Sequence, residues 1–190
     1  MMERRDALSR IADEVRVCKK CQLWKSRTLA VPGEGPLGAE VVIVGEAPGR
    51  NEDLKGRPFV GAAGKNLDEL LGEAGLDRSS VFITNVVKCR PPSNRRPTKK
   101  ESDTCNQYLR RQIELLAPRI LVLLGDVALR QFFPDATLSK THGKTVKRGG
   151  ARFFPTYHPA AMIYDPTLRS VLAEDFRVLR KELGSRGHNA

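Results

Sequence analysis

The chain has 190 residues, a formal net charge of +11 and only four cysteines. This length suits one domain with a substantial core, and the longest apolar runs, at 41–44 and 120–124, are too short to cross a bilayer. The charged N-terminus lacks the apolar segment of a secretory signal, which predicts an intracellular protein. We expect it to be cytoplasmic, of prokaryotic type and without a membrane partner. The positive charge favours a polyanionic partner, most often nucleic acid, over a merely solvated basic surface.

Helical and strand-like segments alternate along the chain. In order, the pattern predicts a helix at 4–17, a Gly- and Pro-rich connector at 31–38, a strand at 39–45, a helix at 62–75, a strand at 80–86, a helix from 98 to about 117, strands at 119–125 and 151–158, and a helix at 167–183. Thr98 and Glu101 form a capping box at the start of the long helix, whereas Pro155 weakens the last strand. Such alternation predicts a parallel sheet with helices on both faces.

Distinctive polar residues follow three of these strands. Glu46 comes directly after the first strand, Asn85 ends the second and His158 follows the last. Each alone is compatible with an ordinary loop or surface role. Because the carboxyl ends of parallel strands lie at one edge of the sheet, the three together predict a ligand cleft at that edge.

The four cysteines form a C-x2-C pair and a second pair separated by fifteen residues: Cys18, Cys21, Cys89 and Cys105. A zinc ribbon requires a second C-x2-C, and a thioredoxin-type pair leaves two cysteines over. Four thiolates from separate elements suit a [4Fe–4S] cluster. Zinc, disulfides and free thiols remain open from the spacing alone.

Four motifs, together with the cysteines, resemble the type 4, iron–sulfur uracil-DNA glycosylases: GEAPGRNED at 45–53, GRPFVGAAG at 56–64, TNVVKCRPP at 84–92 and YHPAA at 157–161. The resemblance extends from about residue 17 to 183. It implies an α/β fold, a three-layer α/β/α sandwich around a four-stranded parallel sheet. It also implies one domain over 1–184, which leaves 185–190 as a tail that we expect to be disordered.

The resemblance further implies a monofunctional, monomeric enzyme of base excision repair. Such an enzyme hydrolyses the N-glycosidic bond of uracil in single- or double-stranded DNA and leaves an abasic site. The four cysteines would hold a structural [4Fe–4S] cluster. The rival interpretation is a non-catalytic iron–sulfur or zinc protein that binds nucleic acid, which gives Glu46, Asn85 and His158 no joint role.

The expected uracil-binding residues lie in these motifs: Glu46, Ala47, Gly49, Glu52, Phe59, Asn85 and His158. The Asn85 amide complements N3–H and O4 of uracil and mismatches cytosine, and Phe59 offers a stacking surface. Glu52, by resemblance, excludes the methyl group of thymine. For catalysis, His158 would donate to O2 of the departing uracil anion, and Glu46 would stabilise the sugar cation or act as general base.

Contacts with DNA are expected from a basic segment and one apolar side chain. The candidate phosphate-binding residues are Arg90, Arg95, Arg96, Lys99 and Lys100. Because a double helix buries its bases, the target uracil must be flipped out or met in a single strand. By resemblance, Met162 would act as a wedge in the space that the flipped base leaves.

Overall fold

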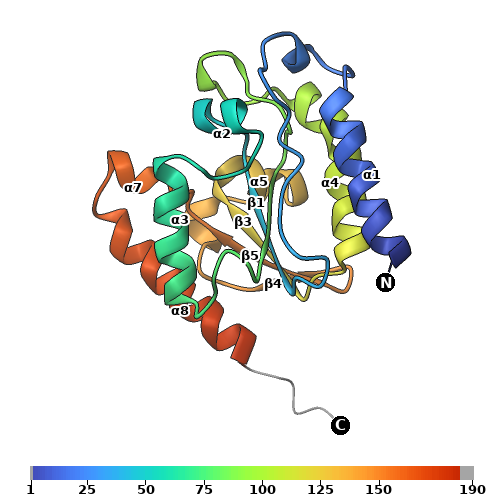
Figure 1. Ribbon diagram of the computed structural model, residues 1–190. Coiled ribbons are helices and arrows are strands. Elements are labelled where there is room, and N and C mark those ends of the chain that lie inside the picture. The colour runs from blue at the N-terminus through green and yellow to red at the C-terminus, as the bar shows by residue number, and fades with distance from the viewer. Residues whose placement is uncertain (1, 185–190) are drawn as a thin grey trace.

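The hydrophobic runs form a central sheet that lies between two layers of helices (Figure 1). The computed structural model describes residues 2–184. The five strands in the sheet order β2-β1-β3-β5-β4 are β2 (Phe82–Asn85), β1 (Val41–Gly45), β3 (Ile120–Leu124), β5 (Ala151–Thr156) and β4 (Val146–Arg148). The first four run parallel, and β4 pairs antiparallel with β5. The expected α/β/α sandwich is confirmed, but the sheet has five strands instead of four.

The unexpected strand, β4, is short and polar. It contains three residues, of which only Val146 is apolar, and it joins β5 through Gly149 and Gly150, both with positive φ. A two-residue turn of this kind suits a tight hairpin. Strand β5 forms despite Pro155, because β4 pairs with it only as far as Phe153, so the missing N–H of the proline costs no bond in that hairpin.

Helices flank the sheet, and the four longest of them lie at the places that the amphipathic pattern predicts. Their bounds are α1 (Met2–Val17), α2 (Arg50–Lys55), α3 (Ala62–Glu73), α4 (Lys99–Leu116), α5 (Gly125–Phe132), α6 (Leu138–Thr141), α7 (Ala161–Tyr164) and α8 (Leu168–Gly184), with 3-10 turns at Gln22–Lys25 and Pro92–Asn94. The predicted capping box of α4 is confirmed. The Glu101 N–H donates to Thr98 Oγ1 at 3.2 Å, and the Thr98 N–H donates to Glu101 Oε2 at 2.8 Å.

Alternate residues of each strand feed two separate cores. In β1, Val42 and Val44 join the core under α1 and α4, whereas Val41 and Ile43 join the core under α3 and α8. Figure 1 shows these two helix pairs on opposite sides of the sheet. A strand that is hydrophobic on both faces is what a parallel sheet between two helix layers requires.

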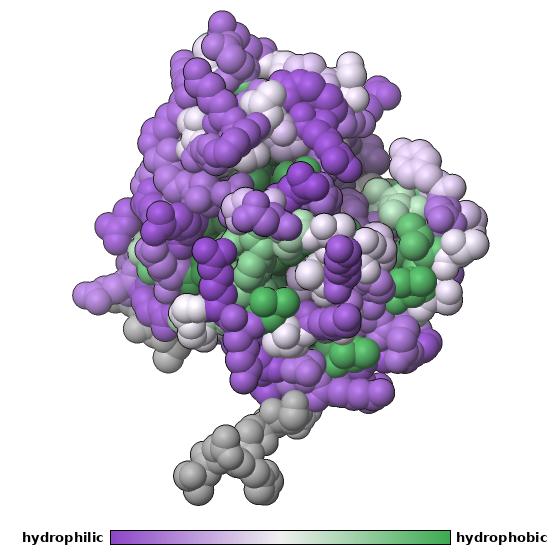
Figure 2. All heavy atoms as spheres, turned by 180° about the vertical axis from the view of Figure 1, so that it is seen from behind, coloured by the Kyte–Doolittle hydropathy of each residue, from purple (hydrophilic) through white to green (hydrophobic). Residues whose placement is uncertain are grey.

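The surface of the described residues is mainly hydrophilic. On the face opposite to Figure 1, hydrophobic side chains appear only in small separate patches (Figure 2). The exposed large hydrophobic residues are Val17, Leu29, Leu54, Ile163 and Tyr164. Within residues 2–184, no helix is both long and apolar enough to span a membrane. The tail expected at 185–190 lies outside the described residues.

Candidate active site

Glu46, Asn85 and His158 line one cavity of about 490 Å³. The parallel register places Gly45 beside Asn85, so Glu46 starts the loop next to the end of β2. Strand β5 pairs in parallel with β3, which brings His158 to the same edge of the sheet. The structure thus brings together three residues that are as much as 112 positions apart in the sequence.

The Asn85 side chain is 1% exposed, and neither its Oδ1 nor its Nδ2 has a hydrogen-bond partner. A buried polar group left unpaired costs about 1–3 kcal/mol. An amide with both of its polar atoms unpaired, in the wall of a cavity, therefore offers one donor and one acceptor to a ligand.

Gly45 lies under this amide. A Cβ atom there would be 2.4 Å from Asn85 Oδ1 and 2.8 Å from the ring of Phe59. Only glycine lets the amide and the aromatic ring come this close over the end of β1. The sequence analysis did not single out Gly45, because a glycine after a hydrophobic strand is also typical of a simple turn.

His158 has a defined tautomer. Its Nδ1 accepts a hydrogen bond from the Ala160 N–H at 3.1 Å, so the neutral ring carries its hydrogen on Nε2. Burial lowers the pKa of His158 to about 4. The ring is therefore neutral near pH 7 and presents a fixed N–H donor. The Phe59 ring stacks beside it, with the centroids 5.5 Å apart.

Glu46 is partly buried in the cavity wall. Burial raises the pKa of its carboxyl group, the positive charge of Arg96 lowers it, and the negative charge of Asp126 raises it further. Arg96 and Asp126 are themselves 3.7 Å apart. The pKa of Glu46 is thus governed first by burial, and then by a cation from the loop before α4 and an anion from the first turn of α5.

Glu52 holds two loops of the cavity through its carboxylate. Oε2 accepts from the Gly49 N–H at 3.1 Å, and Oε1 accepts from the N–H groups of Val60 and Gly61 at 2.8 and 2.9 Å. Glu52 also lines the cavity with Ala47 and Gly49. Glu52 therefore holds the cavity wall in place through its hydrogen bonds, in addition to the steric role that the resemblance implies.

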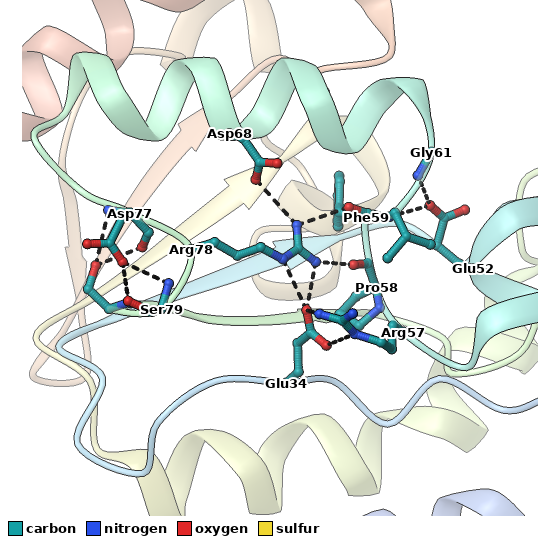
Figure 3. Close-up of polar contacts among 12 residues, drawn as sticks. Glu34, Glu52, Arg57, Pro58, Phe59, Gly61, Asp68, Asp77, Arg78 and Ser79 are labelled. Atoms are coloured by element: carbon teal, nitrogen blue, oxygen red, sulfur yellow. Dashed lines mark hydrogen bonds and ion pairs between the residues drawn. The ribbon is translucent and has the colours of Figure 1, made fainter.

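Phe59 has an unusual backbone conformation. It is 6% exposed and has a φ of +50°, in the left-handed region that non-glycine residues rarely adopt. Arg78 holds this turn by donating to the carbonyl oxygens of Pro58 and Phe59, the latter at 3.0 Å (Figure 3). The same guanidinium donates to Glu34 Oε1 at 2.8 Å. The sequence analysis missed Arg78 and Glu34, because no local pattern marks such a contact.

The basic loop predicted to bind DNA lies at the cavity. Arg95 and Arg96 line it, together with Pro91 and Asn94. Arg95 is also tied to Glu101 by hydrogen bonds of 2.8 and 2.7 Å.

The other three candidate phosphate-binding residues lie along the same segment. Arg90 donates to Asn94 at 2.7 Å. Lys99 pairs with Asp103 at 2.6 Å, and Lys100 is exposed at the start of α4. These residues form a basic rim whose side chains are partly fixed by local contacts.

Met162 does not suit its expected role as a wedge. It is 5% exposed and belongs to the core on the α8 side of the sheet. The exposed residues of helix α7 are its neighbours Ile163, at 50%, and Tyr164, at 86%. Tyr164 lines the cavity and Met162 does not, because the single helical turn at 161–164 directs Met162 towards the core.

The four cysteines also converge. Cys18, Cys21, Cys89 and Cys105 line one small cavity of about 10 Å³, and none of them forms a disulfide. Arg27 Nη1 lies 2.9 Å from the sulfur of Cys89. Burial raises the pKa of the Cys105 thiol to about 12. Within residues 2–184, no group of three or more His, Cys, Asp or Glu side chains is arranged to hold a metal ion.

A larger cavity of about 650 Å³ lies between α1 and the loop at 32–37. None of the unpaired buried side-chain atoms found in residues 2–184 belongs to its lining. The smaller cavity is therefore the stronger candidate for a specific polar ligand.

Comparisons with known proteins show the family of the chain. The family model of the uracil DNA glycosylase superfamily matches residues 32–180. A type-4 uracil-DNA glycosylase of Sulfurisphaera tokodaii is 50% identical over 93% of this chain and 84% of its own length. Type-4 uracil-DNA glycosylases of Archaeoglobus fulgidus and Thermotoga maritima are 46% and 40% identical, over 95% and 98% of this chain and over 96% and 100% of their own lengths.

Proposed function

Since the chain belongs to the uracil-DNA glycosylase superfamily and is a DNA glycosylase, we propose that it hydrolyses the N-glycosidic bond of uracil in DNA. The products are free uracil and an abasic site, which makes this the first step of base excision repair. The observation that carries the proposal is the unpaired, buried amide of Asn85 beside Phe59 and His158.

The Asn85 amide supports recognition of uracil by its Watson–Crick edge. Its Oδ1 accepts from N3–H of uracil, and its Nδ2 donates to O4. Cytosine presents the opposite arrangement, so both atoms of the amide would remain unpaired. Sites that hydrogen-bond one substrate reject an analogue with mismatched groups far more strongly than apolar pockets do.

Thymine is excluded in this proposal by the Glu52 wall. Three backbone N–H groups hold the carboxylate, so the wall cannot yield easily to an extra methyl group. Phe59 supplies the stacking surface for the flipped base, an interaction that contributes roughly 1–3 kcal/mol per base elsewhere.

Bond cleavage leaves a uracil anion and a cation-like sugar. The Nε2–H of neutral His158 donates to O2 of uracil, where negative charge develops. Glu46 faces the same cavity as a carboxylate and supplies the opposite charge for the sugar, or takes a proton from the attacking water. Neither role requires a cofactor at the reacting atoms.

Access to the base in duplex DNA requires a side chain at the mouth of the cavity. Arg96 and the neighbouring basic residues support phosphate contacts. Because Met162 is buried, we assign the wedge to Tyr164, which is exposed and lines the cavity. The proposed substrate therefore includes both single strands, which need no wedge, and duplexes.

We also propose that the four cysteines hold a [4Fe–4S] cluster. They share one cavity, with Arg27 beside Cys89 and the buried Lys88 beside Cys105 as nearby cations. The four thiols come from separate segments of the chain, and in a [4Fe–4S] cluster each thiolate binds a different iron. The cluster would cross-link the end of α1, the segment after β2 and α4.

The unit of activity in this proposal is one domain, residues 1–184, acting as a monomer inside the cell, in the cytoplasm. The scattered exposed hydrophobic residues support the monomer, since they form no extended apolar patch on the face that Figure 2 shows. The rival function is a non-catalytic nucleic-acid-binding metalloprotein, which has no use for an unpaired amide in the wall of this cavity.

The test is release of uracil from an oligonucleotide by the metal-loaded protein. We expect release by the unaltered chain and a loss on the order of 100-fold or more in His158→Ala, as when a donor to a developing anion is removed elsewhere. Asn85→Ala should lose activity comparably and should discriminate less against cytosine. Asn106→Ala, an asparagine outside the cavity lining, is the matched control. DNA binding without uracil release would favour the rival function.

A further inference from the structure

The turn at Phe59 is held in a strained conformation from both sides. On one side, Arg78 donates to the carbonyl oxygens of Pro58 and Phe59. On the other side, Glu52 accepts from the N–H groups of Val60 and Gly61. A non-glycine residue with a left-handed backbone persists only where its surroundings enforce it, and here a cation and an anion enforce it together (Figure 3).

Arg78 is in turn anchored to the strand that carries Asn85. Its guanidinium donates to Glu34 Oε1 through Nε and Nη2, at 3.1 and 2.8 Å. The Glu34 backbone pairs with Ile83 in both directions, with N–H···O distances of 3.0 and 2.8 Å. Ile83 lies in β2, two residues before Asn85. A continuous chain of contacts therefore connects the Phe59 turn to the base-reading amide.

The position of the Phe59 ring relative to this amide has little tolerance. Both groups crowd over Gly45, where a single added carbon atom would collide with each of them. The ring also stacks on His158. A small shift of the turn would change the width of the slot between the amide, the ring and the imidazole.

We propose that Arg78, anchored by Glu34, is a positioning residue that sets the Phe59 ring against the Asn85 amide and so fixes the width of the uracil slot. This inference rests on the proposed function, because it assigns a role in uracil excision. Arg78 is absent from the cavity lining, so it acts only through the turn that it holds.

A merely structural role makes a different prediction. Arg57 pairs with the same carboxylate, at 2.7 Å from its Nε to Glu34 Oε2, and donates to neither carbonyl of the turn. If the ion pairs of Glu34 served only stability, loss of Arg57 and loss of Arg78 would have similar consequences. If Arg78 positions the ring, only its loss slows the reaction.

The test is a double-mutant cycle in kcat/KM for uracil excision, with Arg78→Ala and Phe59→Leu. In the unaltered background we expect Arg78→Ala to lose on the order of 100-fold, as a misplacement of about 1 Å does elsewhere. In the Phe59→Leu background the same substitution should lose little, because coupled residues are not additive. Arg57→Ala is the matched control and should stay close to the unaltered rate.

Two further measurements separate positioning from folding. Arg78→Lys keeps a positive charge near Glu34 but cannot bridge both carbonyls and the carboxylate, so we expect it to lose most of the activity while it melts near the unaltered protein. Amide hydrogen exchange at Val60 and Gly61 should accelerate in Arg78→Ala and not in Arg57→Ala. If Arg78→Ala does not fold, Arg78→Gln takes its place in the cycle.

Additive losses in the cycle, or full activity of Arg78→Lys, would overturn the proposal. Absence of uracil release by the unaltered chain would instead refute the proposed function. In that case faster exchange at Val60 and Gly61 would still support the clamp on the turn, and unchanged exchange would refute the clamp as well.

Discussion

The uracil slot and the cysteine cavity lie at opposite ends of one short segment, from Asn85 to Cys89, and they are prepared for their ligands in different ways. In the slot, the fold already places the polar groups, and the buried Asn85 amide is left unpaired. In the cysteine cavity, burial raises the pKa values of the Cys21, Cys89 and Cys105 thiols. A metal cluster requires thiolates, so binding must displace protons. The fold alone places the groups of the slot, whereas the proposed cluster site forms fully only when the cluster binds and the thiols lose their protons.

Lys88 lies between these two regions. It is 1% exposed, and its Nζ donates to the Asn85 carbonyl at 2.9 Å, to Gln112 at 2.8 Å and to Thr84. Burial lowers the pKa of its ammonium group to about 8, and Cys105 opposes that shift. The backbone that carries the amide is therefore fixed by an internal contact with the buried Lys88.

Gly45→Ala is expected to break the slot and spare the cysteine cavity. The added methyl group would stand 2.4 Å from Asn85 Oδ1 and 2.8 Å from the Phe59 ring, so one of them must move. We expect kcat/KM for uracil excision to fall on the order of 100-fold, while iron content and absorbance near 400 nm stay unchanged. Gly72→Ala, where an added Cβ meets nothing within 4 Å, is the control. A fully active Gly45→Ala enzyme would contradict the crowding of the slot.

Cys105→Ser is expected to have the opposite pattern. Without one of the four proposed ligands, the protein should lose its cluster, and its melting temperature should fall because the cross-link between α4 and the segment after β2 is gone. Uracil excision below the new melting temperature should fall less than in Gly45→Ala, since the slot is held by its own contacts. Iron analysis, thermal unfolding and a uracil-release assay measure the three effects. Retention of iron would show that Cys105 is not a ligand.

Patterns within one element were enough to predict much of the fold. The capping box of α4 and the alternation of strands and helices each depend on residues a few positions apart. The motifs at strand ends likewise indicated Glu46, Asn85 and His158, because parallel strands share an edge.

Features that depend on distant contacts could not be predicted in this way. Arg78 acts on carbonyls about twenty positions away. Gly45 matters because of side chains from two other segments. The burial of Met162 and the exposure of Tyr164 depend on the rotation of one helical turn, which the sequence around 161–164 does not specify.

Tyr164→Ala separates base recognition in the slot from base flipping out of the duplex. If Tyr164 fills the space left by the flipped uracil, its loss should lower activity on duplex DNA by about tenfold, the equivalent of one stacking interaction of roughly 1.4 kcal/mol. Activity on a single strand should not change. Ile163→Ala, on the same helical turn but outside the cavity lining, is the control. Equal losses on both substrates would argue against a wedge.

The smallest expected effect is a shift in the pH dependence of the slot. Glu46 acts as a carboxylate, so the rate should fall as the pH drops through its pKa, which burial raises above the ordinary value of 4.5. The pKa of His158 is about 4, so the imidazole stays neutral through most of this range. Removing the positive charge in Arg96→Ala should raise the pKa of Glu46 and move the acid limb of kcat/KM to higher pH. Asp126→Asn should move it to lower pH.

The two variants test the same pair of charges, because Arg96 and Asp126 are 3.7 Å apart and shift the pKa of Glu46 in opposite directions. When Asp126 loses its charge, Arg96 acts on Glu46 without an opposing neighbour. When Arg96 is lost, the anion acts alone. Lys100→Ala removes a positive charge from the same basic segment, but Lys100 is not one of the charges that shift the pKa of Glu46, so this variant should change the height of the profile and not the position of its acid limb. If the acid limb moved in the same direction in Arg96→Ala and in Asp126→Asn, Glu46 would not be the group that titrates.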